Sequence, residues 1–426
     1  MAPPTLTDPR PTRRGPHLRV LLLTDLFRPV IGGLELQVEL TARELEARGH
    51  EVLVATLAAS DDPADDAGVE VVRIRSWTQR VPGAIAERSH VFHPPAPEPA
   101  TWWRLRALLR AFEPDVVHAH NWMGTSILGS LPASTALVVT MHEYGASCAK
   151  RTMVYAGVTD CTGPALAKCV RCSTAHYGLA RGAPIVLAHR AAVPRLFRRA
   201  DAVIAVSAAV RDRVAEWIPL DRSHVLPAFL AGPPPRSAER PSFVPPDGPY
   251  VLAVGALVPV KGMGILLESY RIAPPPAPLV LIGAARGAAD HALPEGVTLV
   301  KDVPNTEVLR ALQHAAVAVV PSLWGEPCPM TVLEALACGT PVVASAVGGI
   351  PDQLEHGAVG TLVPPGDAAT LASEISAVLE DDERAARMRE ASRRRASRYF
   401  AATVVEEILD VYDQALSRRR APAAIS

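Results

Sequence analysis

The chain lacks the features that mark membrane-spanning, secreted and nucleic-acid-binding proteins. None of its apolar runs is long enough to cross a bilayer. Residues 1–17 are rich in Pro, Arg and Thr without a hydrophobic core, so we expect a disordered leader there and no signal peptide. The 43 Lys and Arg nearly balance the 44 Asp and Glu, which leaves a formal net charge of -1. We therefore expect no nucleic-acid partner and, at most, a peripheral membrane association.

Cysteine is also scarce, which argues against a secreted disulfide scaffold and for a cytoplasmic protein. Only six cysteines occur, and four of them fall in one glycine-containing, polar segment: Cys148, Cys161, Cys169 and Cys172. The last two form a C-x-x-C, so a tetrahedral structural zinc held by all four is one hypothesis. Free or paired thiols are the other, because the first two cysteines are spaced too widely for a standard zinc knuckle.

Two motifs that nucleotide-dependent enzymes often carry are absent. No Asp-x-Asp occurs, so we expect no metal-bridged diphosphate and no cofactor that catalysis requires. The glycine pair Gly32–Gly33 follows a predicted strand but does not have the spacing of the dinucleotide fingerprint, which disfavours a nicotinamide or flavin enzyme. Glycines at this point allow a backbone to approach a ligand closely. A tight turn without a ligand is the alternative.

Short β-branched runs alternate with helical patterns through most of the chain. This alternation is typical of βαβ units and predicts parallel sheets, and a length of 426 residues favours two domains. The fold class is therefore α/β with two Rossmann-like, doubly wound domains. We place the N-terminal domain at 18–231, a Pro-rich linker at 232–248, the C-terminal domain at 249–398, and a last helix with its tail at 399–426.

The most informative stretch runs from Gly325 to Gly339. It follows a short apolar run typical of a buried strand, and Pro329 suits the first position of a helix that Gly339 ends. A helix that begins just past a parallel strand presents free N–H groups and the positive end of its dipole to the crevice. This arrangement favours a bound phosphate, which Pro329, Met330 and Thr331 would contact.

Two carboxylates flank the start of this helix. Glu326 lies on the loop ahead of it and Glu334 lies in its second turn. Carboxylates accept hydrogen bonds from hydroxyls but repel phosphate oxygens, so the pair fits the two sugar ends of a nucleotide-diphosphate sugar. Ordinary solvated helix acids remain the alternative.

Several motifs together resemble the retaining glycosyltransferases of family 4. They are 32–35, 115–120, 139–143, 255–262, the Glu326 and Glu334 pair with 339–344, and 347–352. The resemblance covers nearly the whole chain. It implies the GT-B architecture, in which two Rossmann-like domains face each other across a cleft and a C-terminal helix crosses back to the N-terminal domain.

The resemblance also implies roles for single residues at the donor. Glu334 would hold the ribose hydroxyls and Glu326 would face hydroxyls of the donor sugar. Lys261 would contact the diphosphate, and the backbone N–H of Gly33, after Gly32, would reach the β-phosphate from the other domain. His142 would lie beside the transferred sugar, so we take His142, Glu326 and Lys261 as the catalytic residues.

The sequence departs from the family pattern at two places. Relatives usually carry Arg five positions before the lysine, but here that position is Ala256. Arg28 or Arg286 could replace the missing cation, or the helix dipole could carry more of the phosphate charge. The second departure is 226–229, where many relatives have Pro-Asn-Gly.

The cysteine-bearing loop 144–178 is a hypothesis for the acceptor side of the cleft. Candidate contacts there are Tyr144, Lys150 and Arg151, together with His120 at the end of an earlier strand. His118 and His120 could instead be histidines packed at a strand end.

The function that the sequence predicts is retaining transfer of a sugar from a nucleotide-diphosphate sugar to a hydroxyl of an acceptor. UDP is the family's commonest carrier, so UDP-GlcNAc and UDP-Glc are the expected donors. A small natural-product alcohol or a cyclitol is the expected acceptor, and the Ala, Arg and Pro content suggests a bacterial source. A lipid or polysaccharide acceptor, a GT-B isomerase and a non-catalytic sugar-nucleotide-binding protein remain alternatives, and the oligomeric state is open.

Overall fold

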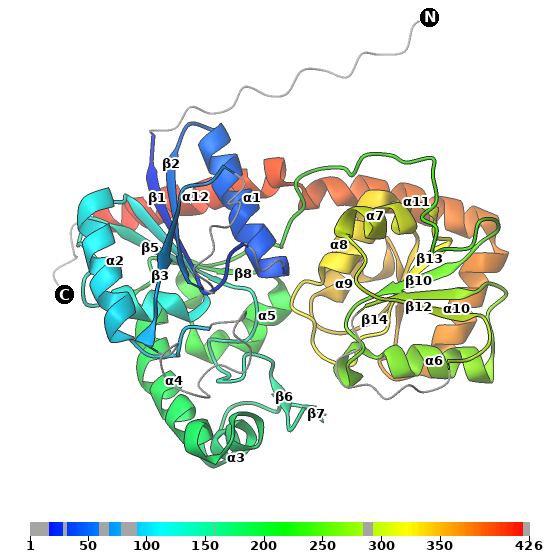
Figure 1. The fold of residues 1–426 in the computed structure, drawn as a ribbon, viewed down its shortest axis with the longest axis horizontal. Coiled ribbons are helices and arrows are strands. Elements are labelled where there is room, and N and C mark those ends of the chain that lie inside the picture. The colour runs from blue at the N-terminus through cyan, green and yellow to red at the C-terminus, as the bar shows by residue number, and fades with distance from the viewer. Residues whose placement is uncertain are drawn as a thin grey trace, which may run out of the picture.

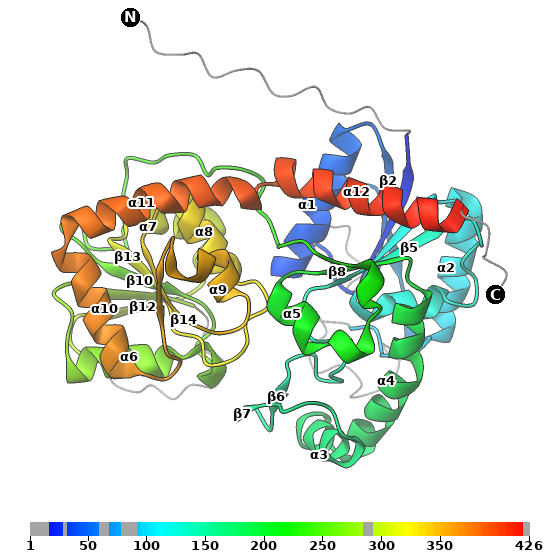
Figure 2. The same cartoon turned by 180° about the vertical axis from the view of Figure 1, so that it is seen from behind.

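The chain folds into two α/β lobes that lie side by side and are linked where the chain crosses between them (Figures 1 and 2). This computed structural model describes residues 17–28, 32–58, 68–77, 92–157, 159–283 and 293–420. Residues 1–16 of the predicted leader and residues 421–426 lie outside the described residues. In the described part of the chain, no helix combines the length and apolarity that a membrane span requires.

The N-terminal lobe is built on a seven-stranded, all-parallel sheet with the order β3-β2-β1-β4-β5-β8-β9. Its strands are β1 (Arg19–Thr24), β2 (Glu51–Leu57), β3 (Val71–Ile74), β4 (Val116–His120), β5 (Ala136–Met141), β8 (Ala202–Ala205) and β9 (Ser223–Val225). The helices of this lobe are α1 (Gly33–Ala47), α2 (Pro99–Phe112), α3 (Leu166–Tyr177), α4 (Leu179–Arg199) and α5 (Ala208–Arg213). The central strands are apolar and buried, as the β-branched runs predict.

The C-terminal lobe repeats this plan with a six-stranded parallel sheet of order β12-β11-β10-β13-β14-β15. Its strands are β10 (Val251–Val254), β11 (Leu279–Ile282), β12 (Val297–Val300), β13 (Val317–Val320), β14 (Val342–Ser345) and β15 (Thr361–Val363). Its helices are α6 (Met263–Ile272), α7 (Asn305–His314), α8 (Met330–Cys338), α9 (Ile350–Gln353), α10 (Ala368–Glu380) and α11 (Asp382–Ala396). Strand order reverses between β1 and β4 in one sheet and between β10 and β13 in the other, and such switch points are where doubly wound folds bind ligands.

The last helix, α12 (Ala401–Arg420), leaves the C-terminal lobe and packs along the N-terminal lobe (Figure 2). Its buried side chains Val404, Ile408 and Tyr412 belong to the N-terminal core. The two chain crossings are hydrogen bonded to each other, because Leu230 N donates to Tyr399 O at 2.8 Å and Ala401 N donates to Leu230 O at 2.8 Å. The expected GT-B fold with a returning C-terminal helix is therefore confirmed.

The segment predicted as a cysteine-bearing loop, 144–178, contains more structure than the sequence suggests. It begins with turns, forms a short antiparallel pair of β6 (Val154–Tyr155) and β7 (Thr159–Asp160), and ends in α3. Helix α3 packs against α4 just after Gly178, whose φ of 86° makes the turn between them. The linker at 232–248 has no helix or strand, as predicted.

Candidate functional site

Two helix N-termini from different lobes face each other. A Cβ added to Gly33 at the start of α1 would lie 3.4 Å from Cγ of Met330 at the start of α8. Neither helix has a side-chain cap, since the residues before them are Gly32 and Pro329. Pro329 thus lies one position before the helix and not at its first position as predicted. The uncapped N–H groups and the positive dipole ends of both helices meet at one place between the lobes.

Lys261 and Glu326 form an ion pair beside α8. Lys261 Nζ lies 2.6 Å from Oε1 of Glu326, and Ser322 Oγ donates to the same oxygen at 2.7 Å. The Glu326 carboxylate is nearly fully buried, whereas the Lys261 side chain is 31 % exposed. The lysine end of the pair therefore remains open to an incoming ligand.

A close backbone approach positions this lysine. Gly262 has a φ of 70°, and a Cβ there would lie 1.7 Å from the carbonyl oxygen of Pro321. Only glycine allows the turn that carries Lys261 to pack against the end of β13. The sequence motif identifies Lys261 but does not show what lies beside it. The close packing of Gly262 on Pro321 places Lys261 next to Glu326.

Glu334 is buried in α8 and has a partner that the sequence did not indicate. Asn305, at the start of α7, donates from Nδ2 to Glu334 Oε1 at 2.8 Å. Burial raises the pKa of Glu334, and the Asn305 hydrogen bond opposes that rise. No signal could have paired the two residues, because they lie 29 positions apart on different helices.

His142 is half-buried and belongs to a row of histidines at the carboxyl ends of β4 and β5, in which His118 and His120 are fully buried. Its Nε2 lies 2.8 Å from Nδ1 of His120, and the two rings stack with centroids 5.1 Å apart. His118 lies beside His120 and bonds Tyr412 Oη at 2.7 Å and Thr140 Oγ1 at 2.6 Å. Burial lowers the pKa of His142 to about 4 and that of His118 to about 3, so both rings are neutral at pH 7.

His120 lies inside the lobe against His142. It is 2 % exposed, and within the described residues its buried Nε2 has no hydrogen-bond partner. A cavity of about 20 Å³ touches this ring, which is room for one water molecule. His118 matches the alternative of a histidine packed at a strand end.

The other predicted acceptor residues are also engaged inside the protein. Tyr144 is 3 % exposed, and its hydroxyl donates across the lobes to Gly325 O at 2.6 Å. Lys150 Nζ donates to Val154 O at 3.1 Å and contacts Cys172 Sγ at 3.4 Å. Tyr144 thus links the two lobes, and Lys150 ties together the cysteine-bearing segment.

Arg151 is the centre of a buried charge cluster at the ends of β1 and β5. Its Nε lies 3.0 Å from Glu143 Oε1 and its Nη1 lies 3.6 Å from Asp25 Oδ2, while its guanidinium lies over the rings of Phe92 and Trp122. Burial raises the pKa of Asp25 to about 7 although Arg151 opposes the rise. Asp25 was missed from the sequence, where a single acid after a strand carries no distinguishing signal.

The four cysteines do not fit a zinc site. Among the described residues, which include all four, no three His, Cys, Asp or Glu side chains are placed to hold a metal ion. Cys169 and Cys172 lie on α3, whereas Cys148 and Cys161 pack at the edge of the N-terminal core, and all are free thiols. The C-x-x-C spacing here is a helical spacing and not a zinc knuckle.

Of the two cations considered in place of Ala256, Arg28 already pairs with Glu39. Its Nε and Nη2 donate to the Glu39 carboxylate at 2.8 and 3.1 Å. Arg286 lies outside the described residues.

Two family descriptions together cover most of the chain. Residues 32–228 match "Glycosyl transferase 4-like domain" and residues 236–395 match "Glycosyl transferases group 1". A glycogen synthase from Mycobacterium tuberculosis is 28 % identical over 95 % of this chain and 97 % of its own length. A D-inositol 3-phosphate glycosyltransferase from Acidothermus cellulolyticus is 29 % identical over 92 % of this chain and 88 % of its own length.

Solved structures share the fold at lower identity. A sucrose-phosphate synthase from Thermosynechococcus elongatus superposes with a TM-score of 0.70 at 21 % identity, covering 94 % of this chain and 99 % of its own. Anabaena HepE in complex with UDP-glucose superposes with a TM-score of 0.64 at 19 % identity, covering 93 % of this chain and 100 % of its own. These similarities show that the chain shares the two-lobed fold of these structures.

Proposed function

Because this chain is a GT-B glycosyltransferase of family 4, we propose that it moves a sugar from a UDP-linked donor to a hydroxyl of an acceptor and retains the anomeric configuration. The observation that carries the proposal is the meeting of the α1 and α8 N-termini beside Lys261. Cleavage of the sugar–phosphate bond builds negative charge on the β-phosphate. Fixed N–H donors and one cation at this point stabilise that charge without having to reorganise.

The Lys261–Glu326 pair contacts both the diphosphate and the sugar of the donor. When the diphosphate binds, Lys261 turns its partly exposed ammonium toward the phosphate, and Glu326 is freed to accept hydrogen bonds from the sugar. Ser322 continues to hold the Glu326 carboxylate in place. Glu334, held by Asn305 in the second turn of α8, accepts the ribose hydroxyls.

Retention follows when the acceptor hydroxyl arrives on the face that the phosphate leaves. The departing phosphate oxygen takes the proton of that hydroxyl, so no side chain needs to act as the base. His142 is neutral, because burial lowers its pKa to about 4. It therefore offers a hydrogen bond to the transferred sugar and does not add positive charge.

The donor and acceptor classes are drawn from the relatives. HepE was solved with UDP-glucose, which supports UDP-glucose as the first donor to test, with UDP-GlcNAc as the second. The similarity to D-inositol 3-phosphate glycosyltransferases supports a cyclitol-type acceptor, and the similarity to glycogen synthase supports a glucan as the competing class.

The test is the release of UDP from each donor with no acceptor, with inositol or inositol phosphate, and with a glucan. Acceptor-dependent UDP release with an α-linked product, identified by NMR, is the expected result for an α-linked donor. A β-linked product would exclude retention. UDP release without any acceptor would favour a hydrolase, and conversion of the donor into another UDP-sugar would favour an isomerase. Donor binding without either reaction would favour a non-catalytic protein.

No cofactor or metal is required in this proposal. Activity is expected to survive brief treatment with EDTA, because helix N-termini and Lys261 take the place of a cation at the diphosphate. Loss of activity on that treatment, restored by added divalent metal, would contradict metal independence.

A further inference from the structure

A long stretch of the N-terminal lobe contains no acidic residue. Residues 161–200, which form α3 and α4, carry seven Lys or Arg and neither Asp nor Glu, although the whole chain has a net charge of -1. Gly182 locks the two helices together, since a Cβ there would lie 2.3 Å from Cα of Thr174. Figures 1 and 2 show this hairpin projecting from the lobe, away from the site between the lobes.

The exposed stripe of α4 divides into an apolar half and a basic half. Ala180, Pro184, Leu187 and Ala191 follow one another at helical spacing on the outer face, and Arg195 and Arg198 continue the same line. The opposite face is buried in the core through Val193, Leu196 and Phe197. The stripe is therefore a solvent-exposed face of α4, and the core is formed by the opposite face.

Large aliphatic side chains are exposed on the hairpin and on the turn at 220–222. Leu179 is 88 % exposed, Leu187 is 58 % exposed, Leu220 is 53 % exposed and Leu166 is 49 % exposed. Single exposed leucines are ordinary on a protein surface, but Leu179 and Leu187 both lie on the basic helix α4, which indicates a surface that contacts an apolar phase or partner.

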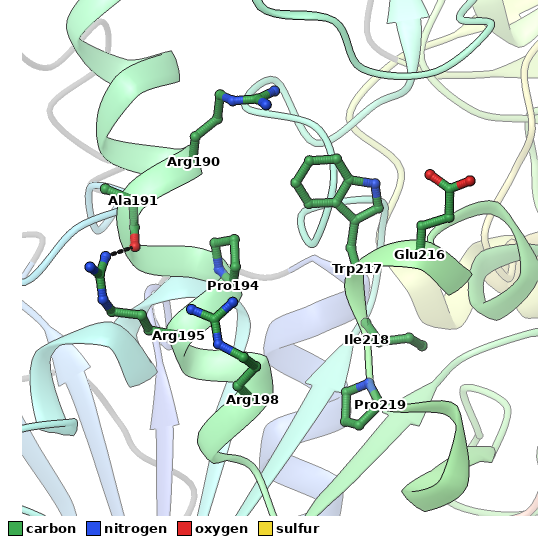
Figure 3. Close-up of a pocket in the computed structure, with 9 residues that line it drawn as sticks. All are labelled: Arg190, Ala191, Pro194, Arg195, Arg198, Glu216, Trp217, Ile218 and Pro219. Atoms are coloured by element: carbon green, nitrogen blue, oxygen red, sulfur yellow. Dashed lines mark hydrogen bonds between the residues drawn. The ribbon is translucent and has the colours of Figure 1, made fainter.

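A wide pocket lies beside the basic half of α4. It measures about 710 Å³, and Figure 3 shows Arg190, Arg195 and Arg198 on the α4 side and Trp217 to Pro219 on the other side, with Glu216 also lining it. The guanidinium of Arg190 lies 5.8 Å from the Trp217 ring centroid. Within the part of the chain that the structure describes, no carboxylate pairs with any of the three arginines.

We propose that the α3–α4 hairpin docks this protein on an anionic lipid bilayer, with Leu179 and Leu187 entering the headgroup boundary and the arginines beside Trp217 holding lipid phosphates. Basic residues near an anionic leaflet and apolar side chains that reach below the headgroups are the two contributions to peripheral binding. A nucleic acid would use the arginines but not the leucines, so the bilayer is the partner that fits both halves. Docking does not depend on the proposed sugar transfer.

The test is co-sedimentation of the full chain with vesicles of phosphatidylcholine alone and with vesicles that also contain phosphatidylglycerol. Binding is expected only to the anionic vesicles and is expected to weaken with salt. Two double variants separate the contributions: Arg195→Glu with Arg198→Glu, and Leu179→Ser with Leu187→Ser. Each is expected to lower vesicle binding by about tenfold or more.

The matched control reverses the same number of charges on another exposed helix. Arg387 and Arg394 on α11 are each 67 % exposed, and Arg387→Glu with Arg394→Glu is expected to leave vesicle binding within about twofold, because α11 lies on the other lobe. Thermal unfolding of each variant verifies that the fold is intact. The proposal is overturned if anionic vesicles do not bind the chain, or if the α11 pair weakens vesicle binding as much as the α4 pair. It is also overturned if the charge reversals on α4 weaken binding but the leucine changes do not, which would indicate a soluble polyanion as the partner.

Discussion

At the scale of single residues, the donor side of the site depends on one lysine. Lys261 is the cation described next to the start of α8, and the family's usual second cation is replaced by Ala256. In the proposed reaction, the charge that develops on the leaving phosphate is therefore stabilised by Lys261 and the two helix ends. A site with fewer cations is more sensitive to the loss of one of them.

We expect Lys261→Ala to lower kcat by about 10²- to 10³-fold, the cost typical of removing one preorganised donor. The donor KM should change less, because α1, α8 and Glu334 still bind the nucleotide. Steady-state UDP release at varied donor concentration measures both constants. Arg271→Ala, on the exposed face of α6, is the control and should leave both unchanged. Unchanged turnover of Lys261→Ala at saturating donor would exclude this role.

His120 is expected to act through His142. The 2.8 Å bond between them sets which nitrogen of His142 carries its proton, and therefore whether His142 donates or accepts toward the sugar. His120→Phe keeps an aromatic ring but loses the bond, and kcat should fall about tenfold with little change in KM. His120→Gln restores a hydrogen-bonding group and should recover part of the loss.

Kinetics of the two variants, with their thermal unfolding measured in parallel, distinguish positioning from structure. If His120→Phe and His120→Gln lower kcat by the same factor and also lower the unfolding temperature by the same amount, His120 only fills the core.

At the scale of elements, the α3–α4 hairpin depends on close helix packing at Gly182. Gly182→Ala would place a methyl group 2.3 Å from Cα of Thr174, and overpacking of this kind costs about 1–3 kcal/mol. Urea unfolding monitored by circular dichroism measures the change. The matched control is Gly264→Ala in α6, where no atom lies within 4 Å of the new Cβ and stability should stay equal or rise by about 0.5–1 kcal/mol. Equal effects at both positions would contradict the packing argument.

At the scale of the whole molecule, a buried acid makes stability depend on pH. Burial raises the pKa of Asp25 from 3.8 to about 7, so the folded state retains a proton that the unfolded chain releases between these values. The contribution of Asp25 to stability is fully present below pH 3.8 and is lost as the pH rises through about 7.

Asp25→Asn mimics the protonated acid and removes this dependence. Relative to the wild type, the variant should become more stable as the pH rises from 4 to 8, by at most about 1.4 kcal/mol per pH unit. Urea unfolding of both proteins across this range measures the difference. Asp221→Asn, at a carboxylate that is 72 % exposed, is the surface control for the loss of one acid. A difference for Asp25→Asn that does not change with pH would mean that Asp25 is already ionised in the folded protein.

The two lobes are also connected at positions far apart in the chain. Tyr144 contacts Gly325 across the interface. Tyr412 of α12 contacts His118, 294 positions away, and so ties the returning helix to the N-terminal sheet.

Local patterns in the sequence determined the elements of this protein. Buried strands such as β1 and β13 are continuous β-branched and aliphatic runs, and Gly339 ends α8 because glycine adopts the left-handed conformation there at a φ of 73°. These signals act over a few residues, so they can be read without knowing the fold. The family motifs added the two-lobed arrangement, which the structure and the comparisons confirm.

Only the tertiary structure decided which side chains meet. Asn305 and Glu334 pair because α7 packs against α8. His120 meets His142, and Arg151 meets Asp25, near the carboxyl ends of parallel strands that share one edge of the sheet. The tertiary structure likewise turned Tyr144 into a contact between lobes and did not bring the four cysteines together at a metal site. The physical reason is that hydrogen bonds, buried charges and metal sites depend on distances in space, whereas the hydrophobic period that forms a helix or a strand is already present in neighbouring residues.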